Sequence, residues 1–252
     1  MMKTLLVRGM LAGLIAGVLA FGFAYAFGEP SVTTAIGLEE SGGHAHSHDA
    51  GAAPAEEHEE ELVPRDIQST VGLLTGVVVY GVAIGGLLSL AFAFAQGRLG
   101  NLRPRLTALL LTGGAFAVVF LVPFLKYPAN PPAVGQAGTI GSRTELYFGF
   151  VAVSLLAGIL ATVFGRKLAD RFGAWSGFLL AAAGYLVVIG VVAWLMPVVD
   201  EVPAEFPAST LWSFRTASIG TQVTLWLALG LAFGAFAEKA LKPKKAAAVA
   251  AS

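Results

Sequence analysis

The sequence predicts an all-α, polytopic membrane protein with six transmembrane helices. Of its 252 residues, 56% are hydrophobic and only 13% are charged, whereas soluble domains are about 25% charged. Six apolar runs each have roughly the 20 residues that a helix needs to cross the hydrocarbon core of a bilayer. They are rich in Gly and Ala, which let transmembrane helices approach closely. The runs cover residues 5–27, 69–95, 106–125, 146–164, 174–196 and 216–237.

The distribution of basic residues predicts that both termini lie on the inner side of the membrane. With the N-terminus inside, the outer segments contain only four lysines and arginines, Arg65, Lys126, Arg143 and Arg215. All the other basic residues then fall in inner segments, as the positive-inside rule requires. Acidic residues show the opposite preference, since only Asp170 and Glu238 are inner.

The first apolar run, 5–27, has two interpretations. It follows a basic start, and Ala24-Tyr25-Ala26 could serve as a signal-peptide cleavage site. Its apolar part is longer than a typical signal core, which favours a membrane span. In both cases the segment that follows emerges on the outer side.

Residues 28–68 are expected to form a disordered, acidic outer loop between the first two spans of a single membrane domain, 1–252. The loop has no hydrophobic periodicity and is dense in Gly, Ala, Pro and Glu. It also holds every histidine, three of them alternating as His-x-His-x-His, so that their imidazoles can converge on one ion. The candidate metal ligands are His44, His46, His48, His58, Asp49 and Glu57. These donors suit borderline transition metals; the alternative is a solvated linker that binds nothing.

The remaining connections differ between the two sides of the membrane. The inner loops "QGRLGNLRPR" and "FGRKLADRFG" are short and basic, whereas the outer segments 126–145 and 197–215 are longer and rich in proline. Each inner loop begins a similar pattern, in which the next span ends in Pro123 or Pro197 and an aromatic-Pro-Ala triplet follows. A parallel two-helix repeat explains this echo, and convergence of similar loops is the alternative.

Charged and aromatic residues at the outer ends of the spans form the second candidate site. Its members are Lys126, Tyr127, Asn130, Arg143, Glu145, Glu205, Trp212, Arg215 and Gln222. We expect the ion pairs Arg143–Glu145 and Arg215–Glu205, because ionisable groups near hydrocarbon pair or face an aqueous cavity. The prolines of "PFLKYPANPP" either end the helix at the interface or form a re-entrant cap over an entry path. Taken singly, the same side chains could merely anchor the protein at the headgroups.

Several functional classes find no support in the sequence. It contains no P-loop, no His-Glu-x-x-His motif and no Ser/His/Asp set, since every histidine falls in one hydrophilic loop. There is no basic, aromatic-rich patch for nucleic acid, and no cysteine to act as a thiolate ligand. We therefore expect neither an enzyme nor a resident cofactor.

Three segments resemble one membrane-protein family. "FLKYPANPPAVG" (124–135), "RTELYF" (143–148) and "EFPASTLWSFRTASIGTQVTLW" (205–226) are similar to the CbtA family of predicted cobalt transporter subunits. The resemblance implies a multi-pass protein of the cell (inner) membrane that takes up cobalt for cobalamin synthesis, with a small, single-span, histidine-bearing CbtB partner. The positions that match the family pattern are Lys126, Tyr127, Pro128, Asn130, Pro131, Pro132, Arg143, Phe206, Pro207, Trp212, Arg215 and Gln222.

The chemistry of the spans leaves the cargo open. No span interior contains Asp, Glu or His, and the matched outer residues include three cations. Backbone carbonyls, amides and waters could line a path for a divalent ion, a partner subunit could add ligands, or the cargo could be an anionic chelate. A non-transporting scaffold or metal receptor for another permease is the alternative function. An intramembrane enzyme would have to depend on Glu145 or Glu205.

Overall fold

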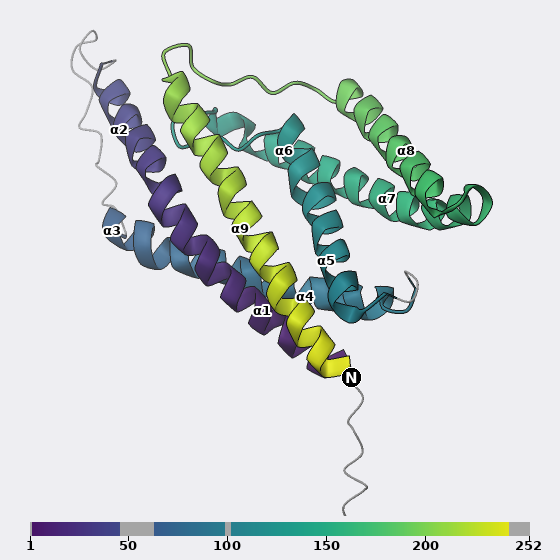
Figure 1. The fold of residues 1–252 in the computed structure, drawn as a ribbon. Helices are drawn as coiled ribbons and strands as arrows, with labels where there is room; N and C mark the ends of the chain where they lie inside the picture. Colours follow the sequence, from purple (N-terminus) through teal and green to yellow (C-terminus); the bar gives the residue numbers. More distant parts are fainter. Residues whose placement is uncertain (1, 46–62, 99–101, 242–252) are drawn as a thin grey trace, which may run out of the picture. The chain divides into compact units, whose positions relative to one another are not determined.

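The computed structural model describes residues 2–45, 63–98 and 102–241, and these are mostly helical, with no strand among them (Figure 1). Six helical segments are long and apolar enough to cross a membrane, and each predicted apolar run coincides with one of them. Their bounds are Met2–Ser41, Arg65–Ala95, Pro104–Lys126, Ile140–Phe172, Ala174–Leu195 and Ala208–Leu241. The predicted all-α, six-span fold is confirmed.

The first three spans are each built from more than one helical element. The first joins α1 (Met2–Phe23), η1 (Ala24–Gly28) and α2 (Glu29–Ala45). The second joins α3 (Arg65–Ile67), η2 (Gln68–Gly72) and α4 (Leu73–Ala95), and the third joins α5 (Pro104–Ala115), η3 (Phe116–Leu121) and α6 (Val122–Lys126). The elements η1, η2 and η3 are π-helical, and π-helical turns occur mostly as short insertions within α-helices.

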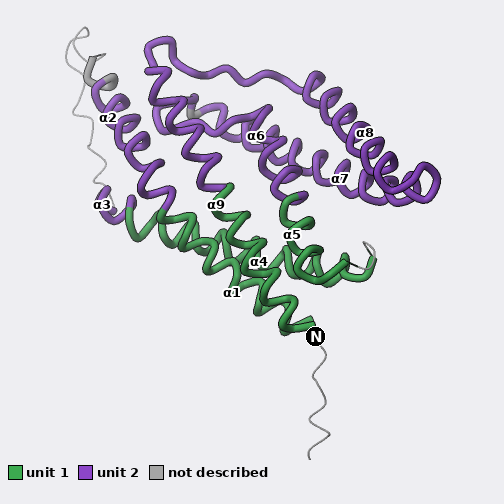
Figure 2. Tube along the Cα trace, viewed as in Figure 1, with its two compact units in different colours: residues 1–22, 70–113, 223–252 green, residues 23–69, 114–222 purple. Residues whose placement is uncertain are grey.

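The chain divides into two compact units, coloured green and purple in Figure 2. Unit 1 comprises residues 1–22, 70–113 and 223–252, and unit 2 comprises 23–69 and 114–222. The expectation of a single membrane domain stays a prediction.

In unit 1, α1 and α4 pack backbone to backbone through glycines spaced four residues apart. A Cβ added to Gly81 would lie 2.6 Å from the carbonyl oxygen of Gly13 and 3.1 Å from the Cα of Gly17. Gly9 and Gly85 meet in the same way. This is the close approach that small residues permit between membrane helices, where lipid offers apolar side chains no reason to associate.

The other helices of unit 1 contribute its larger buried side chains. Phe92 of α4 and Phe233 of α9 (Ala208–Leu241) are fully buried and meet edge to face, with ring centroids 5.2 Å apart. Gly230 of the same helix packs against Thr112 of α5. The geometry of the phenylalanine pair is the one that aromatic quadrupoles prefer.

In unit 2, α7 (Ile140–Phe172) and α8 (Ala174–Leu195) form a tight helical hairpin. The single residue between them is Gly173, whose φ of +85° is a conformation that only glycine adopts without strain. Past the turn, Gly177 packs directly on the backbone of Leu168 and Ala169. This hairpin places the beginning of α7 and the end of α8 at the same end of unit 2.

Two prolines, Pro30 and Pro123, lie inside helices, although the sequence predicted that the third span would end at Pro123. Pro30 follows η1, and Pro123 follows η3 and is buried within a helix that continues to Lys126. A proline cannot donate to the preceding turn and its ring crowds the carbonyl there; a π-helical turn just before it relieves that conflict. The carbonyl of Val118, in η3, instead accepts a 2.6 Å hydrogen bond from Ser154, whose hydroxyl also contacts Tyr185.

The expected loop 28–68 is helical at both of its ends. Residues 29–45 form α2, and residues 65–68 already belong to the second helical span. Extending an existing helix adds one hydrogen bond for each residue fixed and needs no new nucleus, so the first span continues into polar sequence. Within unit 2, Glu29 at the beginning of α2 forms an ion pair with Arg65 of α3.

Candidate functional site

Unit 2 contains a cavity of about 940 Å³ where its two proline-rich connections meet. We call it the interloop cavity. Its lining comes from the end of the third span, the connection after α6, the beginning of α7, the connection after α8, and α9. The lining residues are Phe120, Phe124, Tyr127, Pro128, Ala129, Asn130, Pro131, Pro132, Val134, Ile140, Arg143, Thr144, Tyr147, Phe148, Val198, Val199, Asp200, Val202 and Arg215.

The prolines of the first connection shape one wall of this cavity. Tyr127, the residue after α6, has φ of −126° and ψ of 79°, outside the helical region that proline disfavours in the residue before it. From Pro128 the chain is irregular until Ala137, and Pro131 and Val134 are buried. A non-helical wall at the end of a span is tolerated when it lines a cavity. The segment thus ends the helix at Lys126 and then borders the interloop cavity.

Two hydrogen bonds tie this wall to the second connection. The Lys126 ammonium donates to the carbonyl oxygen of Met196 at 3.2 Å, and the Tyr127 hydroxyl donates to that of Pro197 at 2.8 Å. Burial raises the pKa of the Tyr127 phenol, which keeps it protonated and able to donate. Both acceptors are carbonyls beyond the last turn of α8. Lys126 and Tyr127 therefore hold the two connections together.

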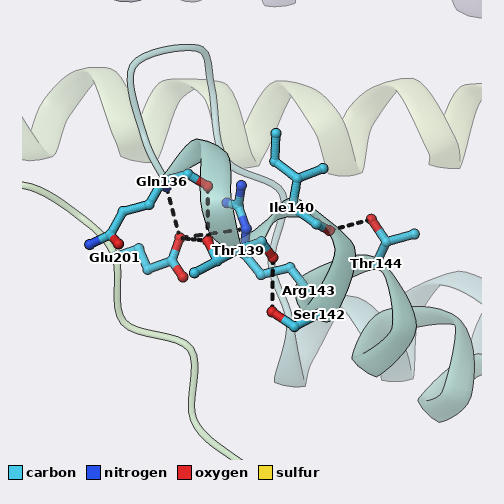
Figure 3. Close-up of polar contacts among 7 residues, drawn as sticks. All are labelled: Gln136, Thr139, Ile140, Ser142, Arg143, Thr144 and Glu201. Carbon is cyan, nitrogen blue, oxygen red and sulfur yellow. Dashed lines mark hydrogen bonds and ion pairs between the residues drawn. The ribbon is translucent and has the colours of Figure 1, made fainter.

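A second tie centres on the carboxylate of Glu201 (Figure 3). It accepts hydrogen bonds from the Thr139 hydroxyl at 2.9 Å and the Gln136 backbone N–H at 3.1 Å. Nε of Arg143 lies 3.5 Å from the same oxygen, an ion pair without hydrogen-bond geometry. The Thr139 bond, then the Gln136 bond and the Arg143 charge, lower the pKa of Glu201, although its burial acts in the opposite direction.

The Arg143 guanidinium also lies close against Gly135. A Cβ on Gly135 would lie 2.7 Å from Cζ and 2.8 Å from Nη2 of the Arg143 guanidinium. Gly135 also has φ of +119°, which other residues rarely adopt. Glycine at this position therefore allows both the turn and the close approach of the charge.

The pKa of Glu201 predicts that the tie loosens in acid. Because the folded-state pKa lies below the ordinary value of 4.5, the stabilisation is fully present above that value. It is lost as pH falls through the folded-state pKa. We expect the hydrogen-exchange protection of the Gln136 amide to fall between about pH 6 and about pH 3. Glu201→Gln should lack this pH dependence, and equal protection of the wild type at both pH values would contradict the assignment.

Arg215 of α9 lies in the cavity lining without a carboxylate partner among the described residues. Its Nη2 donates to Oδ1 of Asn130 at 2.8 Å, and its Nε donates to the carbonyl oxygen of Ala129 at 3.3 Å. Both acceptors are neutral, so its positive charge is not compensated by an ion pair. Arg215 therefore makes the interloop cavity locally positive.

The structure brings together some of the predicted entrance residues and not others. Tyr127, Asn130, Arg143 and Arg215 line the interloop cavity, and Lys126 bridges its two connections. Glu145, Glu205, Trp212 and Gln222 fall outside the lining, and the exposed fraction of Trp212 is 71%.

The predicted ion pairs are wrong. Arg143 pairs with Glu201 instead of Glu145, and Arg215 bonds to Asn130 and Ala129 instead of Glu205. Residues two apart on a helix do not face each other, which separates Arg143 from Glu145 in α7. Gln136, Thr139 and Glu201 were not predicted as site residues. The one signal in the sequence was that Glu201 belongs to an acidic part of the second connection.

The predicted metal ligands lie almost entirely outside the described residues. This holds for His46, His48, Asp49, Glu57 and His58, while the backbone of His44 belongs to the last turn of α2. Among the side chains that the structure describes, no group of three His, Asp or Glu residues could hold a metal ion. The histidine site stays a prediction.

Comparison with known proteins found a family match. A family model described as "Probable cobalt transporter subunit (CbtA)" matches residues 2–238, nearly the whole chain. No curated protein and no solved structure matches significantly. A transporter family and six segments able to span a membrane together make this a multi-pass membrane protein. The word "subunit" in the description also implies that the chain works with partner subunits. The chain belongs to the CbtA family of probable cobalt transporter subunits.

Proposed function

We propose that this chain is the membrane subunit of a cobalt uptake system and that the interloop cavity is its outer entrance. The family match supports cobalt as the cargo. The observation that carries the location is the convergence of Tyr127, Asn130, Arg143 and Arg215 on one cavity at the end of unit 2. With N-in and C-in topology, this end faces outward. Uptake then supplies metal to the cell, with cobalamin synthesis as its destination.

In this proposal the tied connections keep the entrance in shape. The carbonyls of Met196 and Pro197, held by Lys126 and Tyr127, fix the distance between the walls. Glu201 holds Arg143 at the cavity. Arg215 anchors the wall at Asn130. Groups that are already in place before the cargo binds reduce the entropy cost of binding.

The segment that bears the histidines acts upstream of this entrance as a metal collector. We predict that deleting residues 44–58 raises the cobalt concentration needed for half-maximal uptake and leaves the maximal rate near normal. The physical reason is that a tether changes the local concentration of its ligand and not the path that follows. Neutral imidazole is the binding form, so its effect should fade below pH ~6.5. Unchanged concentration dependence after the deletion would remove the segment from the mechanism.

The proposed partner is a small, single-span, histidine-bearing subunit of the CbtB type. It would supply the nitrogen ligands that the described residues of this chain do not gather in one place. Radiolabelled cobalt uptake in cells producing both subunits, with competition by nickel and zinc, tests the proposal. Cobalt accumulation that nickel and zinc displace poorly is the expected result. Accumulation no greater than in cells lacking the chain would contradict it and favour a scaffold or receptor.

A further inference from the structure

We propose that the ligand of the interloop cavity is an anionic metal chelate, a metal ion enclosed by an organic carboxylate, and not a bare divalent cation. This inference rests on the proposed entrance function and names its substrate class. It comes from the size of the cavity, its ligand chemistry and its charge.

The size of the cavity is that of an organic molecule. Sites for drug-sized ligands typically have volumes of about 300–1,000 Å³, and the interloop cavity has about 940 Å³. Its lining combines apolar surface, from residues such as Phe124 and Val134, with a few polar side chains. Apolar walls with a few placed polar groups are typical of sites for organic ligands.

The ligand chemistry of the lining does not suit a bare metal ion. Borderline transition metals are held by imidazole, thiolate or carboxylate groups. Among the residues that the structure describes, the lining contains one carboxylate, Asp200, and no histidine. The guanidinium groups of Arg143 and Arg215 have no lone pair to offer a metal. Glu201 balances the charge of Arg143, so a cation entering here would meet the uncompensated charge of Arg215 and a single acidic side chain of the lining.

The charge of the lining favours an anion. The Arg143 charge is balanced by Glu201, whereas Arg215 contacts only the neutral acceptors of Ala129 and Asn130. A guanidinium has five N–H donors, of which Arg215 uses Nε and one on Nη2. The remaining donors suit a carboxylate, which guanidinium groups recognise through paired hydrogen bonds. The peripheral carboxylates of a chelate provide that acceptor.

Asn130→Asp tests this charge without removing the hydrogen bond. Aspartate keeps the Oδ1 acceptor for Nη2 of Arg215, so the wall stays anchored, but it neutralises the uncompensated charge. Asp200→Asn makes the opposite change in the same lining. Ser209→Asp is the matched control, because it adds one negative charge to an exposed position of α9 outside the lining. Thermal unfolding of each variant checks that the chain is folded.

The probes are two cobalt(III) complexes that do not release their metal, together with cobalt(II) chloride. The full chain in lipid nanodiscs is titrated with Co(III)–EDTA, of charge −1, and with hexaamminecobalt(III), of charge +3. We expect Asn130→Asp to weaken Co(III)–EDTA binding about tenfold or more, the scale of one lost charge-assisted interaction. Asp200→Asn should strengthen it, and Ser209→Asp should leave it unchanged.

The opposite pattern would overturn the inference. If Asn130→Asp strengthens the binding of hexaamminecobalt(III) or cobalt(II) while Co(III)–EDTA binding is absent or insensitive to all three variants, the cavity is a cation site. Radiolabelled cobalt uptake separates this failure from failure of the proposed function. If uptake persists but the chelate does not bind, only the chelate proposal is wrong. If the chelate binds in a charge-dependent way but no uptake occurs, only the transport proposal is wrong.

Discussion

Gly81→Ala is expected to destabilise the folded chain by about 3 kcal/mol, at the upper end of the usual cost of overpacking. The added methyl would lie 2.6 Å from the Gly13 carbonyl oxygen and 3.1 Å from the Gly17 Cα. Both neighbours are backbone atoms, so no side chain can rotate away and α1 and α4 must separate. Thermal unfolding of the detergent-solubilised chain measures the effect.

Gly76→Ala is the control in the same helix. Gly76 has no atom within 4 Å of an added Cβ. Alanine favours helix by about 1 kcal/mol over glycine, so this variant should be as stable as the wild type or slightly more so. Equal melting temperatures for Gly76→Ala and Gly81→Ala would show that α1 and α4 do not make the close approach described above.

Arg215→Ala is expected to abolish cobalt uptake in cells that produce the chain and its partner. The change removes the uncompensated cation of the interloop cavity and the bonds that hold Ala129 and Asn130. Loss of a hydrogen bond to a charged group costs about 1.5–3 kcal/mol, and here two such bonds anchor one wall. Radiolabelled cobalt accumulation over a range of concentrations is the measurement.

The control for this variant is Arg171→Ala. Arg171 is exposed in the last turn of α7, outside the cavity lining. Both proteins must reach the membrane in equal amounts, which immunoblotting of membrane fractions establishes. Uptake by Arg215→Ala equal to that of Arg171→Ala would reduce Arg215 to an interfacial anchor.

The number and type of spans were predictable because their cause is local. A run such as 174–196 is apolar along its whole length, and hydrocarbon admits little other than a helix. The expected disorder of 28–68 was wrong at residues 29–45, because composition describes the cost of ordering a segment alone. It does not include the helix already nucleated in α1, nor the ion pair that Glu29 makes with Arg65.

The sequence pointed to some of the residues that line the interloop cavity, but not to their pairing. Unusual outer cations and prolines drew attention to Lys126, Arg143 and Arg215 without any knowledge of the fold. Glu201 could not be assigned to Arg143, because the two residues meet only when the α7–α8 hairpin brings both connections to one end of unit 2. Packing of this kind is set by residues such as Gly173 and Gly177 and not by the charges themselves.

The most direct test of the transport proposal is cobalt flux into liposomes that contain the purified full chain. Radiolabelled cobalt accumulation is measured with the chain alone, with the chain and its small histidine-bearing partner, and in empty liposomes. We expect accumulation above the empty liposomes in at least the two-subunit preparation, and its loss when the chain carries Arg215→Ala. Absence of flux in both preparations, with the chain folded and correctly inserted, would contradict transport and make the protein a scaffold or receptor.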